Sequence, residues 1–466
     1  MEMAEAHFRL GEHRNVGKLS GLMEGPEPAY SSHDQDPTHR SRATVVGSER
    51  LPTWRWAAVV GLVVVTFFCA GLMIPNAWYW MGVYPMHPLF QDFAAVLAAA
   101  EAVETGIDPY IWAENPFETY GRPHGYGPWW FVLGSLGLTT ADWWWTGIVV
   151  DVAFLIAALL VLNPRDRLSA WLSAVILVSP PVLLGLERAN NDLVIFVLGV
   201  ALLKVLPRGK WWGVMVGGAM VIAATLLKYY PIAVFPVLLM GRRGARTLWG
   251  FGSSVVGLVL MLFLFWGEIT QSLNVIPAPD SPYSYGLKTP FNAWMVEYSH
   301  HGALIAGWIL GVSASAIAFW WAWPRQRGIW VSTVLSPGYA IGALAWCACF
   351  ALNTNFIYRY IWLIFPASRW ISQLRHREWG RLGGVQLGML GFIGFVWIPW
   401  IWIVRNTVDV NSIRVPIFWC ITGVMQAVAL MLTGMVAFHL VKGAISELRA
   451  WKDWYAETHK RAVKPS

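Results

Sequence analysis

The run WAAVVGLVVVTFFCAGLMI occupies residues 56–74 and carries no charged side chain. It is long enough to cross a hydrocarbon core of about 30 Å as a helix. A helix satisfies its own backbone polar groups within one segment, so the run predicts a membrane-spanning helix. It is too long, and begins too late in the sequence, for a cleaved signal peptide, and we expect a signal anchor.

Similar apolar runs recur along all 466 residues, of which 56% are hydrophobic and 13% charged, with a mean hydropathy of +0.48. Soluble domains carry about 25% charged residues, so the composition excludes that class. The repetition predicts an all-α fold, a polytopic transmembrane helix bundle with about a dozen spans. The further runs lie near residues 143–162, 168–186, 191–206, 211–227, 231–240, 247–266, 302–323, 334–352, 356–372, 382–404 and 415–440.

The charges of the connectors predict the topology. Five short connectors carry twelve Lys and Arg and two acids, whereas the long connectors 76–127 and 267–301 carry two Lys and Arg and nine acids. The positive-inside rule places the short connectors in the cytoplasm, the long ones outside, and both termini in the cytoplasm. The net charge of +7 then reflects basic cytoplasmic loops rather than nucleic-acid binding. The short connectors are residues 163–167, 207–210, 241–246, 324–327 and 375–381.

This topology depends on the short apolar segment 128–141. If that segment enters the membrane and returns on the same side, the turns at 186–192, 227–231 and 353–359 share the outer face with both long loops. If it crosses, the turns between residues 163 and 231 change sides. We expect the re-entrant form, which gathers these polar turns on one face.

The first long loop contains the most informative polar residues. Gln91, Asp92 and Phe93 open an Ala-rich stretch with high helix propensity, and Gly106 can end that helix in a left-handed cap. The pattern predicts a short helix along the membrane surface with Asp92 at its start. Asp92 could serve there as an ordinary helix N-cap or as a functional carboxylate, and Asp108 before a proline is typical of a turn.

Four motifs follow one another along the chain. They are the string D-F-x(12)-G-x-D-P-Y at 92–110, Tyr-Gly-Pro at 126–128, the Asn-bearing turn ERANND at 187–192, and Lys-Tyr-Tyr-Pro at 228–231. In this order they resemble the GT-C glycosyltransferases that use polyprenyl-phosphate sugars, and the chain is most similar to the bacterial mannosyltransferase-like family that includes the phosphatidylinositol-mannoside mannosyltransferases. The resemblance spans about residues 56–370.

The resemblance implies an integral membrane glycosyltransferase of the cell envelope. It would transfer a sugar, a hexose such as mannose, from a polyprenyl-phosphate donor to a lipid or glycan acceptor on the extracytoplasmic face. An Asp in the first outer loop of the family is the catalytic base, and the matching residue here is Asp92. An inverting transfer needs such a base, because the acceptor hydroxyl loses its proton as it attacks the anomeric carbon. Family resemblance also favours a bacterial inner membrane.

The leaving phosphate needs cations or hydrogen-bond donors. Lys228, Arg188 and Arg359 are the cations at outer membrane ends. Lys228 matches the Lys-x-x-Pro turn of the family, and each of the three has the alternative of snorkelling to the interface. The resemblance adds Asn190, Asn191 and Tyr126 as substrate-binding residues, and His300 of the second long loop is a further substrate-binding candidate.

The sequence departs from the family in two places. Many members have Gly-Gln-x-Asn where this chain has Glu187-Arg188-Ala189-Asn190-Asn191, which leaves the donor sugar open. The first loop has no Asp-x-Asp, and the four cysteines form no CxxC or His/Cys cluster. We therefore expect no metal and no cofactor besides the donor substrate.

Other polar residues have two interpretations each. Asp151 lies within an apolar run, where it could be functional or form a helix–helix hydrogen bond. His300 and His301 could contact a phosphate or simply lie at the surface. Aromatic side chains of the second long loop could stack on sugars or anchor the chain at the interface. They are Tyr283, Tyr285 and Trp294.

Two alternative functions remain open. A multi-spanning transporter or lipid-linked glycan flippase would show internal repeats and broken helices, and the only broken-helix candidate lies at residues 228–231. A ligase or polymerase of the same architecture would move an oligosaccharide instead of one sugar. The predicted organisation is a disordered cytoplasmic tail at 1–55, a GT-C-like catalytic membrane module at 56–372, C-terminal membrane helices at 373–445 and a cytoplasmic basic tail at 446–466. The expected partners are membrane lipids, the polyprenyl-linked sugar and the acceptor.

Overall fold

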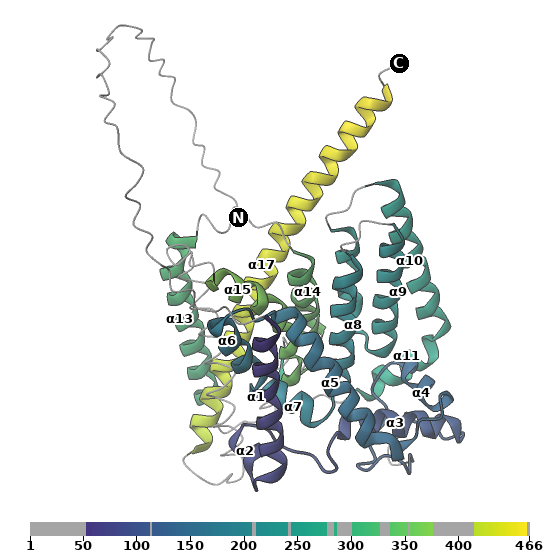
Figure 1. Ribbon diagram of the computed structural model, residues 1–466, viewed down its shortest axis with the longest axis vertical. Helices are drawn as coiled ribbons and strands as arrows, with labels where there is room; N and C mark the ends of the chain where they lie inside the picture. Colours follow the sequence, from purple (N-terminus) through teal and green to yellow (C-terminus); the bar gives the residue numbers. More distant parts are fainter. Residues whose placement is uncertain are drawn as a thin grey trace, which may run out of the picture. The chain divides into compact units, whose positions relative to one another are not determined.

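A computed structural model of the chain is described here for part of its length (Figure 1). The expected tail at 1–55 lies almost entirely outside that part, and so do the expected span at 382–404 and the residues His300, Tyr283 and Trp294. The described residues are 53–111, 114–206, 211–240, 244–276, 284–286, 301–326, 336–352, 355–375 and 414–463.

The described chain is helical, which confirms the predicted all-α polytopic bundle. The first half contains α1 (Thr53–Met73), α2 (Ala77–Trp80), α3 (Gln91–Glu104), η2 (Pro128–Phe131), α4 (Val132–Ser135), η3 (Thr140–Asp142), α5 (Trp143–Leu162), α6 (Arg167–Leu177), α7 (Pro180–Glu187), α8 (Asn191–Val205) and α9 (Trp211–Leu227). The second half contains η5 (Tyr230–Leu239), α10 (Ala245–Leu264), α11 (Trp266–Val275), β1 (Ser284–Tyr285), α13 (His301–Gln326), α14 (Pro337–Leu352), β2 (Asn355–Phe356), η8 (Ile357–Leu363), α15 (Ile364–Arg375) and α17 (Arg414–Val463).

Fewer helices than predicted are long enough to cross a membrane. In the described residues, four helices pass by length and composition, namely Trp54–Met73, Thr140–Leu162, Ala245–Leu264 and part of α17, and the bent pair α6–α7 makes a fifth. Prolines explain part of the difference from about a dozen: Pro180 begins α7 after a bend of 57°, and Pro236 lies inside η5. Several other predicted spans are apolar helices of 10–17 residues.

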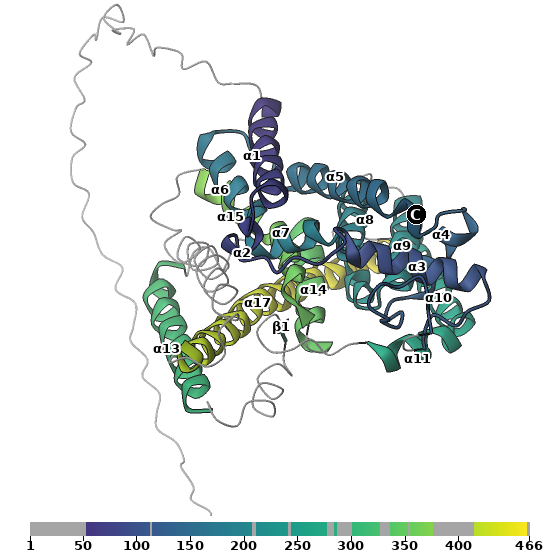
Figure 2. The ribbon, with the colours of Figure 1, turned by 90° about the horizontal axis from the view of Figure 1, so that it is seen from below.

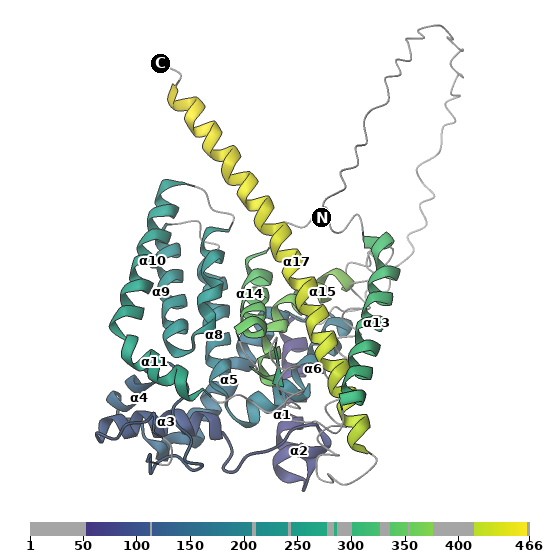
Figure 3. The same ribbon diagram turned by 180° about the vertical axis from the view of Figure 1, so that it is seen from behind.

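The segment 128–141 contains no helix long enough to cross a membrane. It forms η2 and α4, of four residues each, before a turn leads to η3. Eight helical residues rise about 12 Å, well short of a hydrocarbon core of about 30 Å. Both short helices pack against α3, at the same end of the bundle as α11 (Figures 1 and 3).

The first long loop folds as the sequence predicts. Its Ala-rich stretch forms α3, which ends at Glu104, and Gly106 follows in the left-handed region with φ 77°. Asp108 accepts a hydrogen bond from the backbone N–H of Tyr110 at 2.8 Å, which is the expected turn. The helix α3 lies below α8, α9 and α10 in Figure 1 and runs across their direction, as the view from below also shows (Figure 2). A two-residue antiparallel pairing of β1 with β2 connects part of the second loop, including Tyr285, to the chain before η8.

The centre of the bundle is an aromatic core shared by helices that are distant in sequence. Phe196 of α8 packs on Phe154 of α5 at 5.1 Å between ring centroids, and on Phe365 of α15 at 4.9 Å. Trp362 of η8 completes the group at 5.8 Å from Phe196. Each of these side chains is at most 1% exposed. This packing holds η8 against α8, and so sets the position of the polar residues at their ends.

Small residues bring α13 and α17 into close contact (Figure 3). A Cβ added at Gly307 would overlap the backbone oxygen of Cys420, and one added at Gly423 would overlap that of Leu304. Such contacts are typical of membrane helices that associate through glycines. The helix α17 runs unbroken past residue 445, the predicted boundary between the C-terminal membrane helices and the basic tail. The division of the chain into domains stays a prediction.

We predict that Gly307→Leu lowers the stability of the detergent-solubilised protein by about 1–3 kcal/mol, because the two backbones must separate. Thermal unfolding measures the change. Gly302→Leu is the matched control, since a Cβ at Gly302 of the same helix meets nothing within 4 Å. Equal melting temperatures for the two variants would contradict this packing.

Candidate functional site

The turn between α7 and α8 positions three consecutive polar side chains. The backbone N–H of Asn190 donates to the oxygen of Gly185 at 2.8 Å, and that of Ala189 donates to Leu186 at 3.0 Å. With Ala189 at φ 42°, this is a Schellman motif built without glycine. Asn190 then caps α8 by accepting from the N–H of Asp192 at 2.9 Å. The side chains of residues 190–192 are therefore held inside the bundle, fully buried.

The start of α3 docks on this turn through its backbone. The N–H of Phe90 donates to the oxygen of Glu187 at 2.9 Å, and the N–H of Asp92 donates to that of Arg188 at 3.2 Å. The Glu187 carboxylate also accepts from the N–H of Met86 at 2.8 Å. Phe90 adopts φ 63°, which is uncommon for a bulky residue. The first long loop is thereby fixed to the α7–α8 turn.

Asp92 does not cap its helix. Phe90 occupies the N-cap position and makes no side-chain capping bond, so the interpretation of Asp92 as an N-cap is wrong. The Asp92 carboxylate, 4% exposed, instead accepts from Asn190 Nδ2 at 2.6 Å and lies 3.4 Å from Arg122 Nη1. The carboxylate therefore contacts side chains from two other parts of the chain, which is the arrangement expected of a functional carboxylate rather than of a helix cap.

Arg122 is held beside Asp92 by a second carboxylate. Its Nε and Nη2 donate to Glu118 Oε1 at 2.9 and 2.8 Å, and Nη2 also donates to the backbone oxygen of Gln91 at 3.3 Å. The Arg122 side chain is 31% exposed, whereas that of Glu118 is 2% exposed. The guanidinium therefore lies between the buried carboxylates and the solvent.

The Tyr-Gly-Pro motif meets the Lys-Tyr-Tyr-Pro motif directly. The N–H of Gly127 donates to the backbone oxygen of Leu227 at 3.1 Å, and Trp130 Nε1 donates to the same oxygen at 3.0 Å. A Cβ at Gly127 would overlap the oxygen of Leu226, so only glycine allows this approach. The contact places the ring of Tyr126 5.1 Å from the Lys228 ammonium.

Lys228 is paired inside the protein. Its Nζ donates to Asn191 Oδ1 at 2.6 Å and lies 2.9 Å from Asp192 Oδ1, and its side chain is 6% exposed. The rings of Tyr126 and Tyr358 lie within 6 Å on further sides. These contacts contradict the snorkelling alternative. Burial lowers the pKa of Lys228 to about 8, while the Asp192 carboxylate opposes that shift.

Arg359 approaches the same carboxylate from η8. Its Nε lies 3.2 Å from Asp192 Oδ2, and its guanidinium lies over the ring of Tyr230 at 5.3 Å. Tyr230 donates its hydroxyl to Asp192 Oδ1 at 2.8 Å and accepts from Trp362 Nε1 at 3.0 Å. Arg359 is therefore also paired internally and does not reach outward as a snorkelling side chain would.

The charged residues form two clusters of opposite sign. The acidic cluster contains Asp92, Glu118 and Arg122, and the basic cluster contains Asp192, Lys228 and Arg359. The adjacent residues Asn190 and Asn191 join them, since each bonds one cluster. Such an arrangement can hold a proton acceptor beside a site for an anion.

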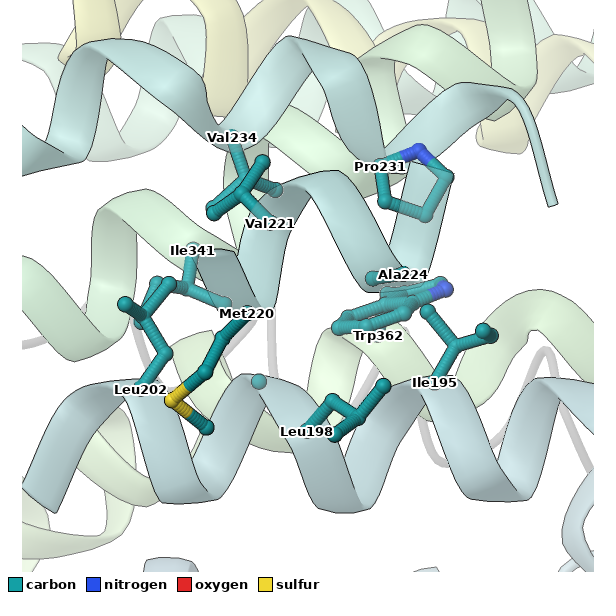
Figure 4. Close-up of a pocket in the computed structure, with 11 residues that line it drawn as sticks. Ile195, Leu198, Leu202, Met220, Val221, Ala224, Pro231, Val234, Ile341 and Trp362 are labelled. Carbon is teal, nitrogen blue, oxygen red and sulfur yellow. The ribbon is translucent and has the colours of Figure 1, made fainter. Parts of the chain in front are cut away.

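A small apolar pocket lies between α8, α9, η5, η8 and α14 (Figure 4). Two of its lining residues adjoin Tyr230, which hydrogen-bonds Asp192 of the basic cluster. Pro231 follows Tyr230 in the sequence, and Trp362 Nε1 donates to the Tyr230 hydroxyl. The remaining lining residues are Ile195, Leu198, Gly199, Leu202, Met220, Val221, Ala224, Val234 and Ile341.

The other predicted site residues have different positions. The side chain of Arg188 lies towards Glu187, with 3.8 Å between Arg188 Nε and Glu187 Oε2, while only its backbone oxygen meets Asp92. Asp151 is buried, and its Oδ1 has no hydrogen-bond partner in the described part of the chain, so the expected helix–helix hydrogen bond is not formed by that oxygen. His300 lies outside the described residues.

The sequence did not identify three charged residues of the two clusters, Glu118, Arg122 and Asp192. Asp192 belongs to the ERANND turn, in which Arg188, Asn190 and Asn191 were the predicted site residues, although a carboxylate next to an apolar run is itself a signal. Arg122 is one of only two Lys and Arg in the two long connectors, which could have singled it out. Glu118 has no comparable sequence signal, because its pairing with Arg122 arises only when the loop folds.

A segment of the chain matches a known family. Residues 123–327 match the model of Glycosyltransferase family 87. The match includes Tyr126, the ERANND turn and Lys228, and it excludes Asp92 and Arg359. No curated protein matches the chain. The family match indicates a glycosyltransferase and, with the apolar helices, an integral membrane protein. In the described residues, no three His, Cys, Asp or Glu side chains gather as metal ligands would.

His124 supports the loop that carries Tyr126. Its backbone N–H donates to Pro109 at 2.7 Å, its ring lies 3.4 Å from the oxygen of Gly127, and Phe131 packs on it at 5.0 Å. Burial lowers the pKa of His124 from 6.5 to about 4. The imidazole is therefore neutral at neutral pH.

We predict that this loop loses stability in mild acid. Because the pKa of His124 is lower in the folded state, the stabilisation is complete above pH 6.5 and is lost as the pH falls toward about 4, by up to about 3 kcal/mol. Thermal unfolding at about pH 7 and about pH 5 measures it, and His124→Phe should reduce the difference. Substituting the exposed His87 is the control. An unchanged difference in His124→Phe would contradict the prediction.

Proposed function

We propose that the protein transfers a hexose, such as mannose, from a polyprenyl-phosphate donor to a hydroxyl of a lipid or glycan acceptor. The observation that carries the proposal is the linkage of Asp92 to Lys228 through Asn190 and Asn191, with bonds of 2.6 Å at each side. A candidate base and a candidate phosphate-binding cation are thereby held at opposite sides of one short turn. The family match to residues 123–327 supports the reaction class.

In this proposal Asp92 acts as the general base. Its carboxylate takes the proton of the acceptor hydroxyl as that oxygen forms a bond to the anomeric carbon. The bond between the anomeric carbon and the phosphate oxygen breaks on the opposite face, and its electron pair leaves with the polyprenyl phosphate. The product has inverted configuration. The hydrogen bond from Asn190 orients the carboxylate for this step.

The basic cluster would bind the donor's phosphate. Lys228 and Arg359 supply two cations against one carboxylate, so the cluster keeps a formal positive charge that stabilises the phosphate as it leaves. The apolar lining of the pocket beside Pro231 and Trp362 is of the chemistry that would contact the first part of a prenyl chain (Figure 4). Asn191, Tyr126 and His300 belong to the proposed substrate-binding set, and Arg188 would contribute mainly through its backbone.

The setting of the reaction is part of the proposal. We infer that the site faces the extracytoplasmic side of a bacterial inner membrane, with both termini in the cytoplasm, on the basis of the connector charges. We also infer a metal-independent reaction in which the donor is the only lipid-linked cosubstrate. The proton acceptor and the cations of the site would supply the catalysis.

Asp92→Asn should lower kcat by about 10²- to 10⁴-fold and leave expression and donor binding largely intact, because the amide keeps the hydrogen-bond geometry but cannot accept the proton. Transfer from a labelled polyprenyl-phosphate sugar measures kcat. Asp108→Asn is the matched control from the same loop, since an amide oxygen can still accept from Tyr110. Full turnover by Asp92→Asn would disprove the base assignment.

Activity should fall as the pH rises through about 8, because the buried Lys228 then loses its proton and its charge. The pH profile of kcat/KM for the donor tests this. Lys228→Arg should keep partial activity without that alkaline fall, and Lys228→Gln should be impaired at every pH. A profile of Lys228→Arg with the wild-type alkaline limb would contradict the assignment.

The donor assay also separates the alternatives. Membranes containing the protein are incubated with labelled polyprenyl-phosphate sugar, and acceptor products are resolved by size. Addition of one sugar supports the proposal. Transfer of a preassembled oligosaccharide would indicate a ligase, and movement of label across vesicles without transfer would indicate a flippase.

A further inference from the structure

We propose that Asp192 is a positioning residue, the counter-ion that holds Lys228 and Arg359 together so that both face the donor's phosphate. The inference rests on the proposed function and adds a residue to it. Asp192 is fully buried, so it acts through the cations rather than on the substrate.

Both carboxylate oxygens of Asp192 are engaged. Oδ1 lies 2.9 Å from Lys228 Nζ and accepts from the hydroxyl of Tyr230 at 2.8 Å, and Oδ2 lies 3.2 Å from Arg359 Nε. Its backbone N–H is held by Asn190 at 2.9 Å. One side chain of α8 thus fixes the connector after α9 and the start of η8 in a single arrangement.

The two cations need such a partner. A guanidinium keeps its proton in proteins, so Arg359 stays charged at every accessible pH and repels the Lys228 ammonium. A buried charge without an opposite charge is strongly unfavourable, and Lys228 would then lose its proton or move away. With Asp192 between them, the three groups keep one net positive charge.

The exposed fractions of Asp192, Lys228 and Arg359 fit a buried counter-ion with two cations that face the substrate. Asp192 is 0% exposed, Lys228 is 6% exposed and Arg359 is 17% exposed. An anion that enters therefore meets the cations and not the carboxylate. A purely structural ion pair would leave no net charge, whereas this cluster has two cations for one acid.

The groups around Lys228 define what removing Asp192 would do. From α8 come Asn191 and Asp192, from the outer loop Tyr126, from η8 Tyr358 and Arg359, and from α3 Asp92. Burial and Arg359 lower the pKa of Lys228, and the carboxylates Asp192 and Asp92 raise it. Without Asp192, only Asp92 opposes the fall, so Lys228 would lose its charge at a lower pH.

The test compares Asp192→Asn with the wild type in transfer from a labelled polyprenyl-phosphate sugar across a range of pH. We expect KM for the donor to rise about 10-fold or more, and the alkaline limb of kcat/KM to move down by about one pH unit or more. Near-saturating donor in mild acid should restore most of kcat. Circular dichroism and size-exclusion chromatography in detergent show whether the variant folds.

Two further variants separate positioning from simple structural support. Tyr230→Phe removes a neutral hydrogen bond from the same carboxylate oxygen, leaves all three charges, and should keep the wild-type alkaline limb. The double variant Asp192→Asn with Arg359→Gln removes the repelling cation as well. Its alkaline limb should return toward the wild-type position while KM for the donor stays high, and it offers the same measurement if the single variant does not fold.

The outcomes distinguish the two levels of inference. A wild-type protein that transfers sugar, with Asp192→Asn showing unchanged KM and an unchanged alkaline limb, overturns the role of Asp192 alone. So does a double variant whose alkaline limb is no higher than that of the single variant. A wild-type protein that transfers no sugar from any polyprenyl-phosphate donor overturns the proposed function, and the inference with it.

Discussion

A charged side chain inside a helix bundle is stable only where an opposite charge meets it. The two cations of the basic cluster, Lys228 and Arg359, come from different parts of the chain, and Asp192 meets both. Because one carboxylate must reach both cations, the connector after α9 and the start of η8 have to converge on the first turn of α8. The aromatic contact between Phe196 and Trp362 holds the same elements together one turn deeper in the core.

Backbone strain marks the place where the acidic cluster is attached. Phe90 and Ala189 both adopt left-handed conformations, which cost non-glycine residues about 1–3 kcal/mol each. Each strained residue lies beside a hydrogen bond between the first long loop and the α7–α8 turn, and those bonds help to hold it. The result is a fixed distance between Asp92 and Asn190. A looser connection would leave the two clusters free to move relative to one another, and a base and a leaving group have to be aligned.

Local structure was predictable where the signal itself is local. The Ala-rich stretch forms α3, Gly106 follows its end in a left-handed conformation, and Asp108 makes the expected turn. The short segment 128–141 forms only two four-residue helices, η2 and α4, and the sidedness predicted for it stays a prediction. By contrast, about a dozen long spans were expected, while the described residues contain four or five helices of that length. Hydropathy reports that a segment is apolar, but bends at residues such as Pro180 and the depth of packing decide whether it crosses as one straight helix.

Within the site, the sequence identified Asp92, Asn190, Asn191 and Lys228 as polar residues at turns, and the structure brings these four together. It assigned no partners, because a carboxylate at a helix start has the same local appearance whether it caps the helix or faces another segment. The pairings depend on contacts between distant residues. Arg122 lies 30 residues from Asp92 in the sequence, and Arg359 lies 167 residues from Asp192.

Composition and periodicity alone determined that this is a helical membrane protein, and the motif order alone pointed to sugar transfer. Only the tertiary structure decided that the Asp92 carboxylate contacts other segments instead of capping α3, and that Asp192 pairs with the two cations. The physical reason is that hydrophobic patterning acts within a segment, whereas a buried charge selects its partner from whatever the fold brings within a few ångströms.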